Sequence, residues 1–414
     1  MGYETKFGAI ASCAIFGMIC SWAVAAGQPN SATVEDDTPV LEAVIVTAER
    51  RPQPLHDVPV SITALTGEEL ENSKIGSIVD MSKLVPGLTV TQASTGQAQL
   101  FIRGIGTDIV GAGLEDAVAV YIDGVYQSRS AGTAMQFIDV DRVEVLKGPQ
   151  GTLYGRNATG GAINIISKAP SREKTGRFDV QAGSHNQRIV RGTVSGPLSD
   201  GAINGRLSML YNRDDGDTRN LLLNLSGNSN DVRAMRGSLE FLPGNSFRVT
   251  LNAHHYRNDP TTVFKPLHPA VNPLFTVFGA TVITDPRTVM QNMPNEASLT
   301  DSGIDATAKW DLGSSLFTSI TAVRKTDYNV KRADLDGTEV PLMNVKSPTT
   351  EIGIPEVTNF FSQEFIWASD NDGPLAWTGL LSYSHQKVDA SGFNFSMPLF
   401  KLSTNSVATV VTDA

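Results

Sequence analysis

The chain has 414 residues, enough for two or three ordinary domains, and its 41% hydrophobic and 18% charged residues exclude a disordered chain. The formal net charge of −10 and the pI near 5.1 argue against nucleic acid as a partner, because phosphates require a basic surface. A mean hydropathy of −0.09 excludes a membrane protein built of apolar helices.

The N-terminus has the features of an export signal. Lys6 precedes an apolar run from Phe7 to Cys20, and the small residues of "SWAVAAG" follow. A short membrane anchor is the alternative, but the run is shorter than the roughly 20 residues that a span requires. We therefore expect residues 1–26 to be a signal peptide. Both cysteines, Cys13 and Cys20, lie in this segment, so the mature protein would form no disulfide.

A possible partner-binding strand follows the signal. Residues 27–43 are polar and acidic without periodicity, which predicts a flexible tether. The segment 44–51, "VIVTAERR", is a short β-branched strand candidate between this tether and the prolines Pro52 and Pro54. Its local pattern fits an isolated strand and an edge strand of the following domain equally well.

Residues 52–170 consist of short apolar runs broken by Gly and Pro, which predicts a small mixed α/β domain. We expect helices near Gly67–Leu70 and Ile78–Leu84. The pair Asp123-Gly124 lies between two apolar runs and predicts a tight hairpin turn, because these residues tolerate positive φ.

The run "DVDRVEVLKG" alternates in hydrophobicity. Val143 and Val145 share one face, and Arg142 and Glu144 share the other. The pattern predicts a half-buried strand whose charged face needs partners or water.

Glycines are concentrated in "GTLYGRNATGGAINIIS", from Gly151 to Ser167. Such clusters bind phosphate when a helix begins directly behind them. Here the residues from Gly161 to Ile166 alternate and are β-branched, which predicts a strand, and no Gly-Lys-Ser/Thr follows the glycines. A second cluster, "RGIGTDIVGAG", has Ile109 in place of a third motif glycine. We therefore expect a phosphate-binding loop at neither cluster.

From about Gly176 the sequence changes to strands of some ten residues with period two. Long polar connections alternate with tight turns, which is typical of a barrel that crosses a membrane. A soluble β-sandwich is the alternative, but its strands are usually shorter and its loops short at both ends. In "FRVTLNAHHY" the apolar face has Phe247, Val249, Leu251 and Ala253, and the polar face has Arg248, Thr250, Asn252 and His254.

These motifs resemble those of the TonB-dependent outer-membrane receptors of Gram-negative bacteria. "VIVTAERR" resembles the TonB box, and "FIRGIGT", "VAVYIDGVY" and "RVEVLKGPQGTLYGRNATGGAINI" resemble successive signatures of the family's plug domain. The resemblance implies a β-dominated fold, in which a small mixed α/β plug is followed by antiparallel transmembrane strands of a barrel of about 22 strands. It implies no enzymatic activity and no cofactor.

The resemblance also implies partners and a location in the outer membrane. TonB would pair with the box by strand addition, and membrane lipid would surround the barrel. A scarce solute such as a ferric siderophore would bind outside the cell before energy-coupled uptake. Haem, cobalamin, nickel chelates and saccharides are further ligands of the family, and the sequence does not choose among them. The residues implied to bind TonB are Val44, Ile45, Val46, Thr47 and Ala48.

Two other sets of residues receive roles from the resemblance. The glycine-rich cluster would form a tightly folded end of the plug, with glycines where the backbone packs too closely for a Cβ. Charges of the plug would meet opposite charges on the barrel wall, because a buried unpaired charge is costly. The structural set comprises Gly104, Gly151, Tyr154, Gly155, Arg156, Asn157, Gly160 and Gly161, and the contact set comprises Arg103, Arg142, Glu144 and Lys147.

The segment 171–414 departs from the family pattern. It holds only nine or ten strand candidates where about 22 are expected. It ends in "VATVVTDA", without the aromatic residue that the family's last strand normally carries. We therefore expect a receptor fragment or a truncated product, whose open sheet would not work as an importer by itself.

Other chemistry is not indicated. His254 and His255 are adjacent on a predicted strand and therefore point to opposite faces, which disfavours a chelating pair. The sequence contains no His-Glu-x-x-His or Gly-x-Ser-x-Gly motif, so we expect no catalytic and no metal site. The alternative from another class is an exported soluble β-rich glycan-binding protein or enzyme, which would leave the plug signatures unexplained.

Overall fold

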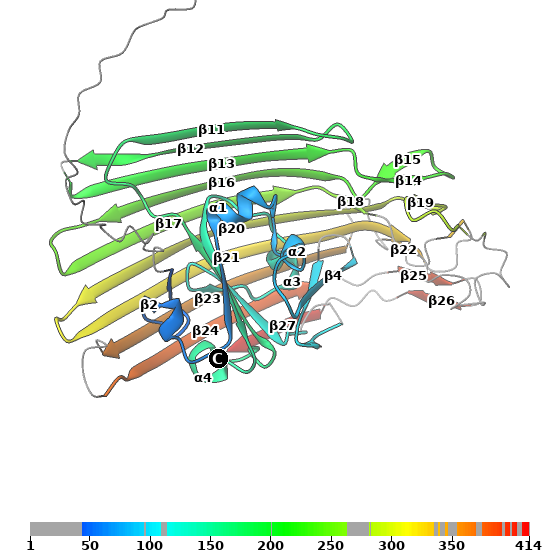
Figure 1. Ribbon diagram of the computed structural model, residues 1–414. Coiled ribbons are helices and arrows are strands. Elements are labelled where there is room, and N and C mark those ends of the chain that lie inside the picture. The colour runs from blue at the N-terminus through cyan, green and yellow to red at the C-terminus, as the bar shows by residue number, and fades with distance from the viewer. Residues whose placement is uncertain are drawn as a thin grey trace, which may run out of the picture. The chain divides into compact units, whose positions relative to one another are not determined.

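The computed structural model describes residues 44–413 apart from 95–96, 109–113, 200, 263–280, 282, 335–337, 340–343, 347–353, 370–374, 391–393, 398–399 and 404–407. The predicted signal peptide and tether lie outside the described residues. The described residues form a small mixed region, residues 44–167, which we call the N-terminal region, followed by a long antiparallel sheet (Figure 1).

A five-stranded sheet forms the centre of the N-terminal region. Its strand order is β3-β9-β10-β7-β8, with β10 parallel to β7 and the other neighbours antiparallel. Strands β4, β5 and β6 form a second sheet. The strands of the region are β1 (Ile45–Val46), β2 (Gln53–Pro54), β3 (Ile62–Thr66), β4 (Leu88–Ser94), β5 (Gln97–Ile102), β6 (Ile105–Gly106), β7 (Val118–Ile122), β8 (Val125–Tyr126), β9 (Val140–Lys147) and β10 (Gly161–Ser167).

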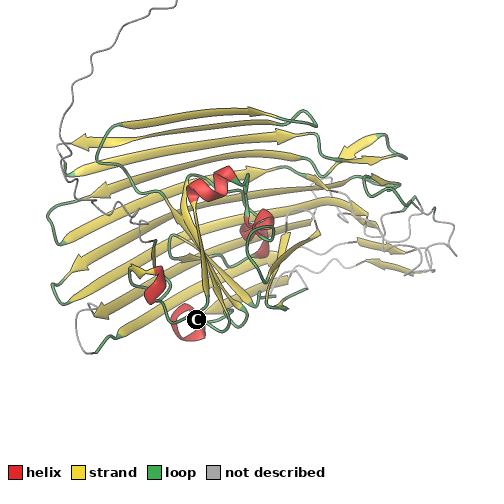
Figure 2. Ribbon diagram, in the orientation of Figure 1, coloured by secondary structure: helices red, strands yellow, loops and turns green. Residues whose placement is uncertain are grey.

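Short helices connect these strands (Figure 2). The helix predicted at Gly67 is confirmed, and a capping box stabilises its start: the Glu69 backbone N–H donates to the Thr66 side chain, and the Thr66 N–H donates to the Glu69 carboxylate. The second predicted helix ends at Met81 instead of Leu84. The helical elements are η1 (Leu55–Asp57), α1 (Gly67–Asn72), α2 (Ile78–Met81), α3 (Ser130–Thr133) and α4 (Gly151–Tyr154).

The predicted hairpin at Asp123-Gly124 is confirmed. Asp123 has φ 52° and Gly124 has φ 83°, the left-handed values that a tight two-residue turn requires. The turn joins β7 to β8 and pairs Ile122 with Val125.

Strand β9 is buried on both faces, so the prediction of a half-buried strand is wrong. Val143 and Val145 lie in the hydrophobic core beneath α1 and α2. Glu144, on the opposite face, is 0% exposed. It is covered by the segment that follows β1, where the Thr47 backbone N–H donates to the Glu144 carboxylate at 2.9 Å. The alternation of residues within β9 could not predict this burial, because the covering residue Thr47 lies 97 residues from Glu144 in the chain.

The glycine-rich cluster folds into α4 and then β10, which confirms the predicted strand, whereas the helix was not predicted. A Cβ on Gly161 would lie 2.3 Å from the Leu146 carbonyl oxygen, and one on Gly160 would lie 2.7 Å from the Ile105 carbonyl oxygen. Gly104 and Gly155 have φ of 79° and 71°, values that L side chains rarely adopt. Gly151 has no heavy atom within 4 Å of its Cβ position, so close packing does not explain it.

The long sheet contains nine described strands of eight or more residues, joined in antiparallel order. The connections at one end are short, as at 242–246 and 312–314, and those at the other end are long, as at 215–229 and 259–294. These strands are β11 (Thr175–Ala182), β12 (Arg188–Ser199), β13 (Ile203–Asp214), β16 (Asn230–Phe241), β17 (Phe247–Asn258), β20 (Asn295–Asp311), β21 (Ser315–Asp334), β23 (Ile354–Ser369) and β24 (Thr378–Ala390).

Shorter strands occupy the long connections or extend the sheet. They are β14 (Thr218–Asn220), β15 (Leu225–Gly227), β18 (Thr261–Thr262), β19 (Thr288–Val289), β22 (Asn344–Lys346), β25 (Asn394–Met397), β26 (Phe400–Ser403) and β27 (Ala408–Asp413).

The faces of the long sheet are inverted relative to those of a soluble protein. The apolar side chains Ile304, Val323 and Leu381 are 64%, 58% and 69% exposed, whereas the polar Asn252 and Asp305 are buried. The predicted alternation is therefore present, with the apolar face turned outward and the polar face inward. A soluble sandwich would bury the apolar face instead. Among the described residues, the structure contains no helix that is both long and apolar enough to span a membrane.

Asp116, just before β7, is an acidic residue in a mostly buried position. Burial raises its pKa to about 6, the charge of Arg129 lowers it, and the neighbouring Glu115 raises it. Since the unfolded chain has a carboxyl pKa of 3.8, the folded protein binds this proton more tightly than the unfolded chain does.

We predict that Gly161→Ala destabilises the N-terminal region by about 2–4 kcal/mol, because the new Cβ meets the backbone of β9. Gly151→Ala is the matched control: it has open space, lies in a helix, and should leave stability unchanged or raise it by up to about 1 kcal/mol. Amide hydrogen exchange of peptides from β10 measures both. Equal exchange rates in the two variants would refute the packing argument.

We also predict that the stability of the N-terminal region falls as the pH rises from about 4 through 6, because Asp116 then loses its proton in the folded state. Asp116→Asn removes this dependence and should be more stable than the unmodified protein at pH 7.5 by on the order of 2 kcal/mol, but not at pH 4. Urea unfolding at both pH values tests this. A difference between the variants that does not change with pH would contradict the assignment.

Candidate functional site

The segment 44–48 is folded back onto the N-terminal region. Strand β1 pairs with β2 in antiparallel fashion, Ile45 with Pro54 and Val46 with Gln53. Val46 and Ala48 are buried in a cluster that contains Tyr121, Leu146 and Tyr154. The interpretation of an isolated strand is therefore wrong, and the edge strand is what the structure contains. Its two small apolar side chains bury well enough against the five-stranded sheet to hold it there.

One buried carboxylate holds this segment. Glu144 accepts hydrogen bonds from the Thr47 backbone N–H at 2.9 Å and from the Thr47 hydroxyl at 3.2 Å. The Arg142 Nε donates to the same carboxylate at 2.9 Å. Glu144 is thus fully buried but paired and hydrogen-bonded, as a buried charge must be.

The predicted contacts of four charged residues with the barrel wall are not found. Arg142 and Glu144 pair with each other. Arg103 donates to the Ser61 hydroxyl at 2.9 Å, and its charge, together with partial burial, lowers the pKa of Lys147. The described hydrogen bonds and ion pairs of these residues all lie within the N-terminal region, because neighbouring charges of one sheet can satisfy each other locally.

Arg50 was not identified from the sequence, although it makes the most unusual contacts of the segment. It has φ 63°, and its guanidinium lies 4.7 Å and 4.4 Å from the ring centroids of Tyr121 and Tyr154. Its Nε donates to the Leu153 carbonyl at 3.1 Å. Its Nη2 lies 3.5 Å from the Glu364 carboxylate on β23. Burial raises the pKa of Tyr121 to about 12, so the ring stays neutral beside the cation.

The rings of Tyr121 and Tyr154 form an aromatic cage around Arg50, and other residues of the glycine-rich cluster support it. Tyr154 packs edge-on against Tyr121, with 5.2 Å between the ring centroids. Arg156 forms an ion pair with Glu115 at 3.1 Å. Asn157, at φ 66°, donates its amide to the Tyr126 hydroxyl at 2.8 Å. The glycine-rich loop therefore contacts the positively charged guanidinium of Arg50, and not a phosphate group.

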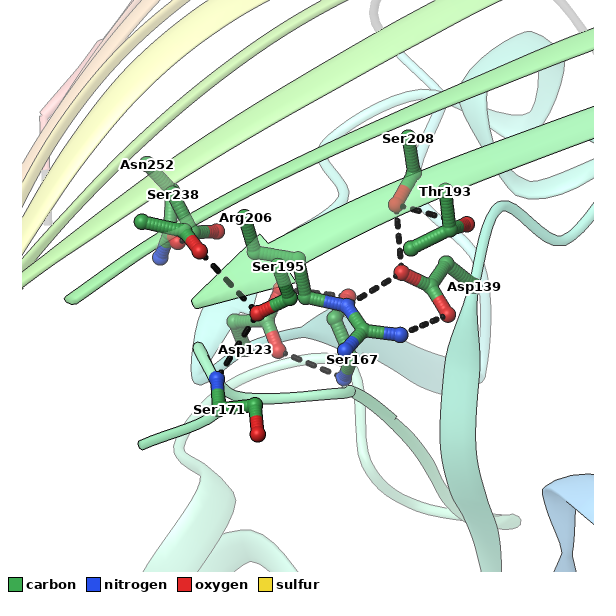
Figure 3. Close-up of polar contacts among 11 residues, drawn as sticks. Asp123, Asp139, Ser167, Ser171, Thr193, Ser195, Arg206, Ser208, Ser238 and Asn252 are labelled. Carbon is green, nitrogen blue, oxygen red and sulfur yellow. Dashed lines mark hydrogen bonds and ion pairs between the residues drawn. The ribbon is translucent and has the colours of Figure 1, made fainter. Parts of the chain in front are cut away.

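Three further ion pairs that are largely buried join the N-terminal region to the long sheet, and an exposed pair, Glu71 with Arg177 of β11 at 2.7 Å, is a fourth. Figure 3 shows Asp139 held by Arg206 of β13, at 2.5 Å and 2.6 Å, and by the Ser208 hydroxyl. Burial by itself would raise the pKa of Asp139. The hydrogen bonds from Arg206 and Ser208 have the opposite and larger combined effect, so the pKa lies below its usual value. The other two pairs are Asp123 with Arg236 of β16 at 2.6 Å and Arg129 with Glu356 of β23 at 2.6 Å.

These pairs were missed because their partners are far apart in sequence, by 227 residues for Arg129 and Glu356. The available signal was the alternation of the strands. A charged residue on the polar face of an inside-out sheet needs a partner in the interior, and Arg206, Arg236, Glu356 and Glu364 stand in such positions.

The two adjacent histidines behave as predicted. His254 lies 2.7 Å from the Asp301 carboxylate and is buried, whereas His255 is exposed and lies 2.8 Å from the Ser302 hydroxyl. They do not converge on one site. Within the described residues, no three His, Cys, Asp or Glu side chains are grouped so as to hold a metal ion.

Comparison with known proteins agrees with this architecture. The family model described as TonB-dependent Receptor Plug Domain matches residues 54–162. The pesticin receptor of Yersinia enterocolitica is 30% identical over 213 residues, which cover 51% of this chain and 30% of that receptor. The ferripyoverdine receptor of Pseudomonas aeruginosa is 28% identical over 233 residues, 55% of this chain and 26% of that receptor.

Solved receptors have the same fold. The ferric yersiniabactin uptake receptor FyuA from Yersinia pestis superimposes with a TM-score of 0.68 at 21% identity, over 83% of this chain and 50% of that chain. The pyoverdine outer membrane receptor FpvA from Pseudomonas aeruginosa gives a TM-score of 0.67 at 19% identity, over 87% and 51%. The chain thus spans about half the length of these receptors.

The N-terminal region corresponds to the plug of these proteins, and the inside-out sheet corresponds to strands of their barrel. Residues 54–162 thus match the TonB-dependent receptor plug domain, and the chain as a whole is similar to the plug and part of the barrel of TonB-dependent outer-membrane receptors of Gram-negative bacteria.

Proposed function

We propose that this receptor imports a ferric chelate across the outer membrane, and that TonB drives the import by pairing with residues 44–48. The observation that carries the proposal is the docked strand β1, which forms only two residue pairs with β2 and is otherwise held by one side-chain cluster and by the hydrogen bonds of Thr47 to Glu144. A strand so lightly paired is suited to exchange partners, because an incoming strand replaces its main-chain hydrogen bonds in kind.

The names of similar proteins support a ferric cargo. One is a ferripyoverdine receptor, and another is an uptake receptor for ferric yersiniabactin. A vitamin B12 transporter of Vibrio vulnificus is also 33% identical over 168 residues. Ferric chelates are therefore the first solutes to test, and cobalamin is the comparison.

An aromatic row supports the orientation of the barrel in the membrane. The register places Phe247 opposite Trp310, Trp310 opposite Phe317, and Phe317 opposite Trp367. Trp377 packs edge-on against Trp367, at 5.5 Å between ring centroids. Aromatic girdles mark the interface between lipid and water, and this one lies at the short-turn end, the periplasmic end of bacterial barrels. The long connections then face the outside of the cell.

Docking and TonB binding would compete. Val46 and Ala48 are buried against the plug, and the Thr47 N–H is used by Glu144, so TonB must detach the segment before a strand can form. Burial of a valine contributes roughly 1.5–3 kcal/mol. The apparent affinity for TonB is therefore the intrinsic affinity multiplied by the fraction of molecules in which the segment is undocked.

Deletion of the gene in its native bacterium tests the proposal. Uptake of radiolabelled iron from catecholate and hydroxamate chelates, and uptake of cobalamin, should be measured with and without the gene. Loss of uptake of a ferric chelate supports the function, and unchanged uptake of every solute in the panel refutes it.

We predict that Val46→Pro abolishes uptake and leaves binding of the chelate to whole cells intact, because proline removes an N–H that a paired strand must donate. Val46→Thr keeps the N–H and the branched shape and is the matched control, which should transport at nearly the normal rate. Both changes are made in the native gene. Normal uptake in Val46→Pro would exclude residues 44–48 as the TonB-binding strand.

We predict that Glu144→Ala undocks the segment, because the Thr47 N–H and the Arg142 guanidinium lose their buried acceptor, at a cost of about 1–3 kcal/mol. The affinity for a soluble TonB fragment should rise about tenfold, and a spin label at an Ile45→Cys position should become mobile. Asp141→Ala is the control, since Asp141 pairs with the same Arg142 from an exposed position. An immobile label in Glu144→Ala would show that Glu144 does not hold the segment.

A further inference from the structure

The plug is held to the barrel by charges of opposite sign on two sides. On one side the plug carboxylates Asp123 and Asp139 meet arginines of β16 and β13. On the other side the plug arginines Arg50 and Arg129 meet carboxylates of β23. In the order of the sheet, β17, β20 and β21 separate β16 from β23. We call these the carboxylate side and the arginine side of the plug.

The carboxylate side is the more firmly attached. Asp139 accepts two short bonds from Arg206, one on each oxygen, and a third from Ser208 (Figure 3). Such a bidentate pair combines strength with fixed geometry. A neutral contact lies beside it, because the Asn212 amide of β13 donates to the Gln136 side chain at 2.9 Å.

The same side holds the chain where it passes from plug to barrel. The Ser167 N–H and hydroxyl donate to Asp123 at 2.8 Å and 2.9 Å. The Lys168 N–H donates to the Asp139 carbonyl at 3.0 Å. The Ser171 N–H donates to the Ser195 hydroxyl of β12 at 2.8 Å. The carboxylate side therefore coincides with the covalent connection, as a hinge would.

The arginine side is attached more weakly, and its Arg50 lies next in the chain to residues 44–48, to which TonB is proposed to bind. Arg50 approaches Glu364 only to 3.5 Å, and Arg129 makes both of its contacts with Glu356, at 2.6 Å and 2.7 Å, to a single carboxylate oxygen. Arg50 follows Ala48 by two residues, which span at most about 7 Å when extended. A force that pulls on residues 44–48 therefore acts on Arg50 almost at once. The same force reaches Asp123 and Asp139 only through the intervening sheet.

We propose that the plug opens on its arginine side and stays hinged on its carboxylate side, so that solute passes along the inner face of β21 and β23. The proposal rests on the proposed uptake function. Withdrawal of Arg50 breaks the contact with Glu364 and empties the cage of Tyr121 and Tyr154, and water can then solvate the polar inner face of β23. The carboxylate side keeps its hydrogen bonds during this movement.

Reversible cross-links test which side opens. Tyr126→Cys with Phe360→Cys joins the plug to β23, where the two rings lie 6.3 Å apart, and Gln136→Cys with Asn212→Cys joins it to β13. Neither pair alters the four ion pairs. Both cysteines of the 414 residues lie in the predicted signal peptide, and any further cysteine of the mature protein is replaced by serine before the links are introduced. A bifunctional methanethiosulfonate closes each link in cells, and a reductant opens it.

The β23 link should lower uptake of the ferric chelate at least tenfold, with recovery after reduction, and the β13 link should leave at least half of the rate. Equal inhibition by the two links, or inhibition by the β13 link alone, would overturn the proposal. Binding of the chelate to whole cells confirms that each variant is folded.

Thiol labelling gives a readout that needs no uptake. Ser362→Cys lies on β23 two residues from Glu364, and Asn204→Cys lies on β13 two residues from Arg206. A small maleimide should label position 362 at least fivefold faster in energised cells than in cells without TonB, and position 204 at the same rate in both. Equal acceleration at both positions would overturn the proposal. Asymmetric labelling without uptake of any chelate would refute the proposed cargo and leave the opening side in place.

Discussion

Everything in this structure depends on the rule that a backbone in hydrocarbon must satisfy its own hydrogen bonds. The long sheet obeys it through a continuous antiparallel ladder, and the side chains then divide into an apolar outer face and a polar inner face. The polar inner face would be expensive if it were dry and unpaired. It is instead paired with the plug, whose carboxylates and arginines meet Arg206, Arg236, Glu356 and Glu364. Because the lipid requires an apolar outer face, the inner face is polar, and the plug is therefore held mainly by polar and charged contacts.

A polar interface of this kind can be opened and closed again. When an ion pair separates into water, each charge regains its hydration, so the net loss is small compared with the exposure of an apolar core. Among the described residues, buried apolar contacts between plug and barrel form two clusters, one around Tyr256 and one around Phe360. The plug itself is different: Val143, Val145 and Ile163 form a continuous core under α1 and α2. This contrast favours movement of the plug as folded segments over its complete unfolding.

The sequence predicted what is encoded locally. The alternation of β17, the turn at Asp123-Gly124 and the strand after the glycines need only nearest neighbours, and all three are present. The covering of Glu144 by Thr47 and the cage of Tyr121 and Tyr154 around Arg50 could not be predicted, because Glu144 lies 97 residues from Thr47 and the nearer ring lies 71 residues from Arg50. Period two reports which face of a strand is apolar, but it does not report what covers the other face. The predicted contacts of the plug charges with the barrel are absent for a different reason: Arg142 has an acceptor two residues away and needs none on the barrel.

The lengths of β20 and β21 have a consequence for the cell surface. These strands have 17 and 20 residues, and at about 3.3 Å per residue the longer one extends roughly 65 Å. The apolar band of a bacterial barrel is only about 25 Å tall, and tilted strands of 9–11 residues are enough to cross it. The aromatic row at Trp310 and Phe317 marks one edge of that band, at the end of the strands that carries the short connections. The surplus length therefore projects on the opposite side of the band, and this end of the sheet stands clear of the lipid head groups.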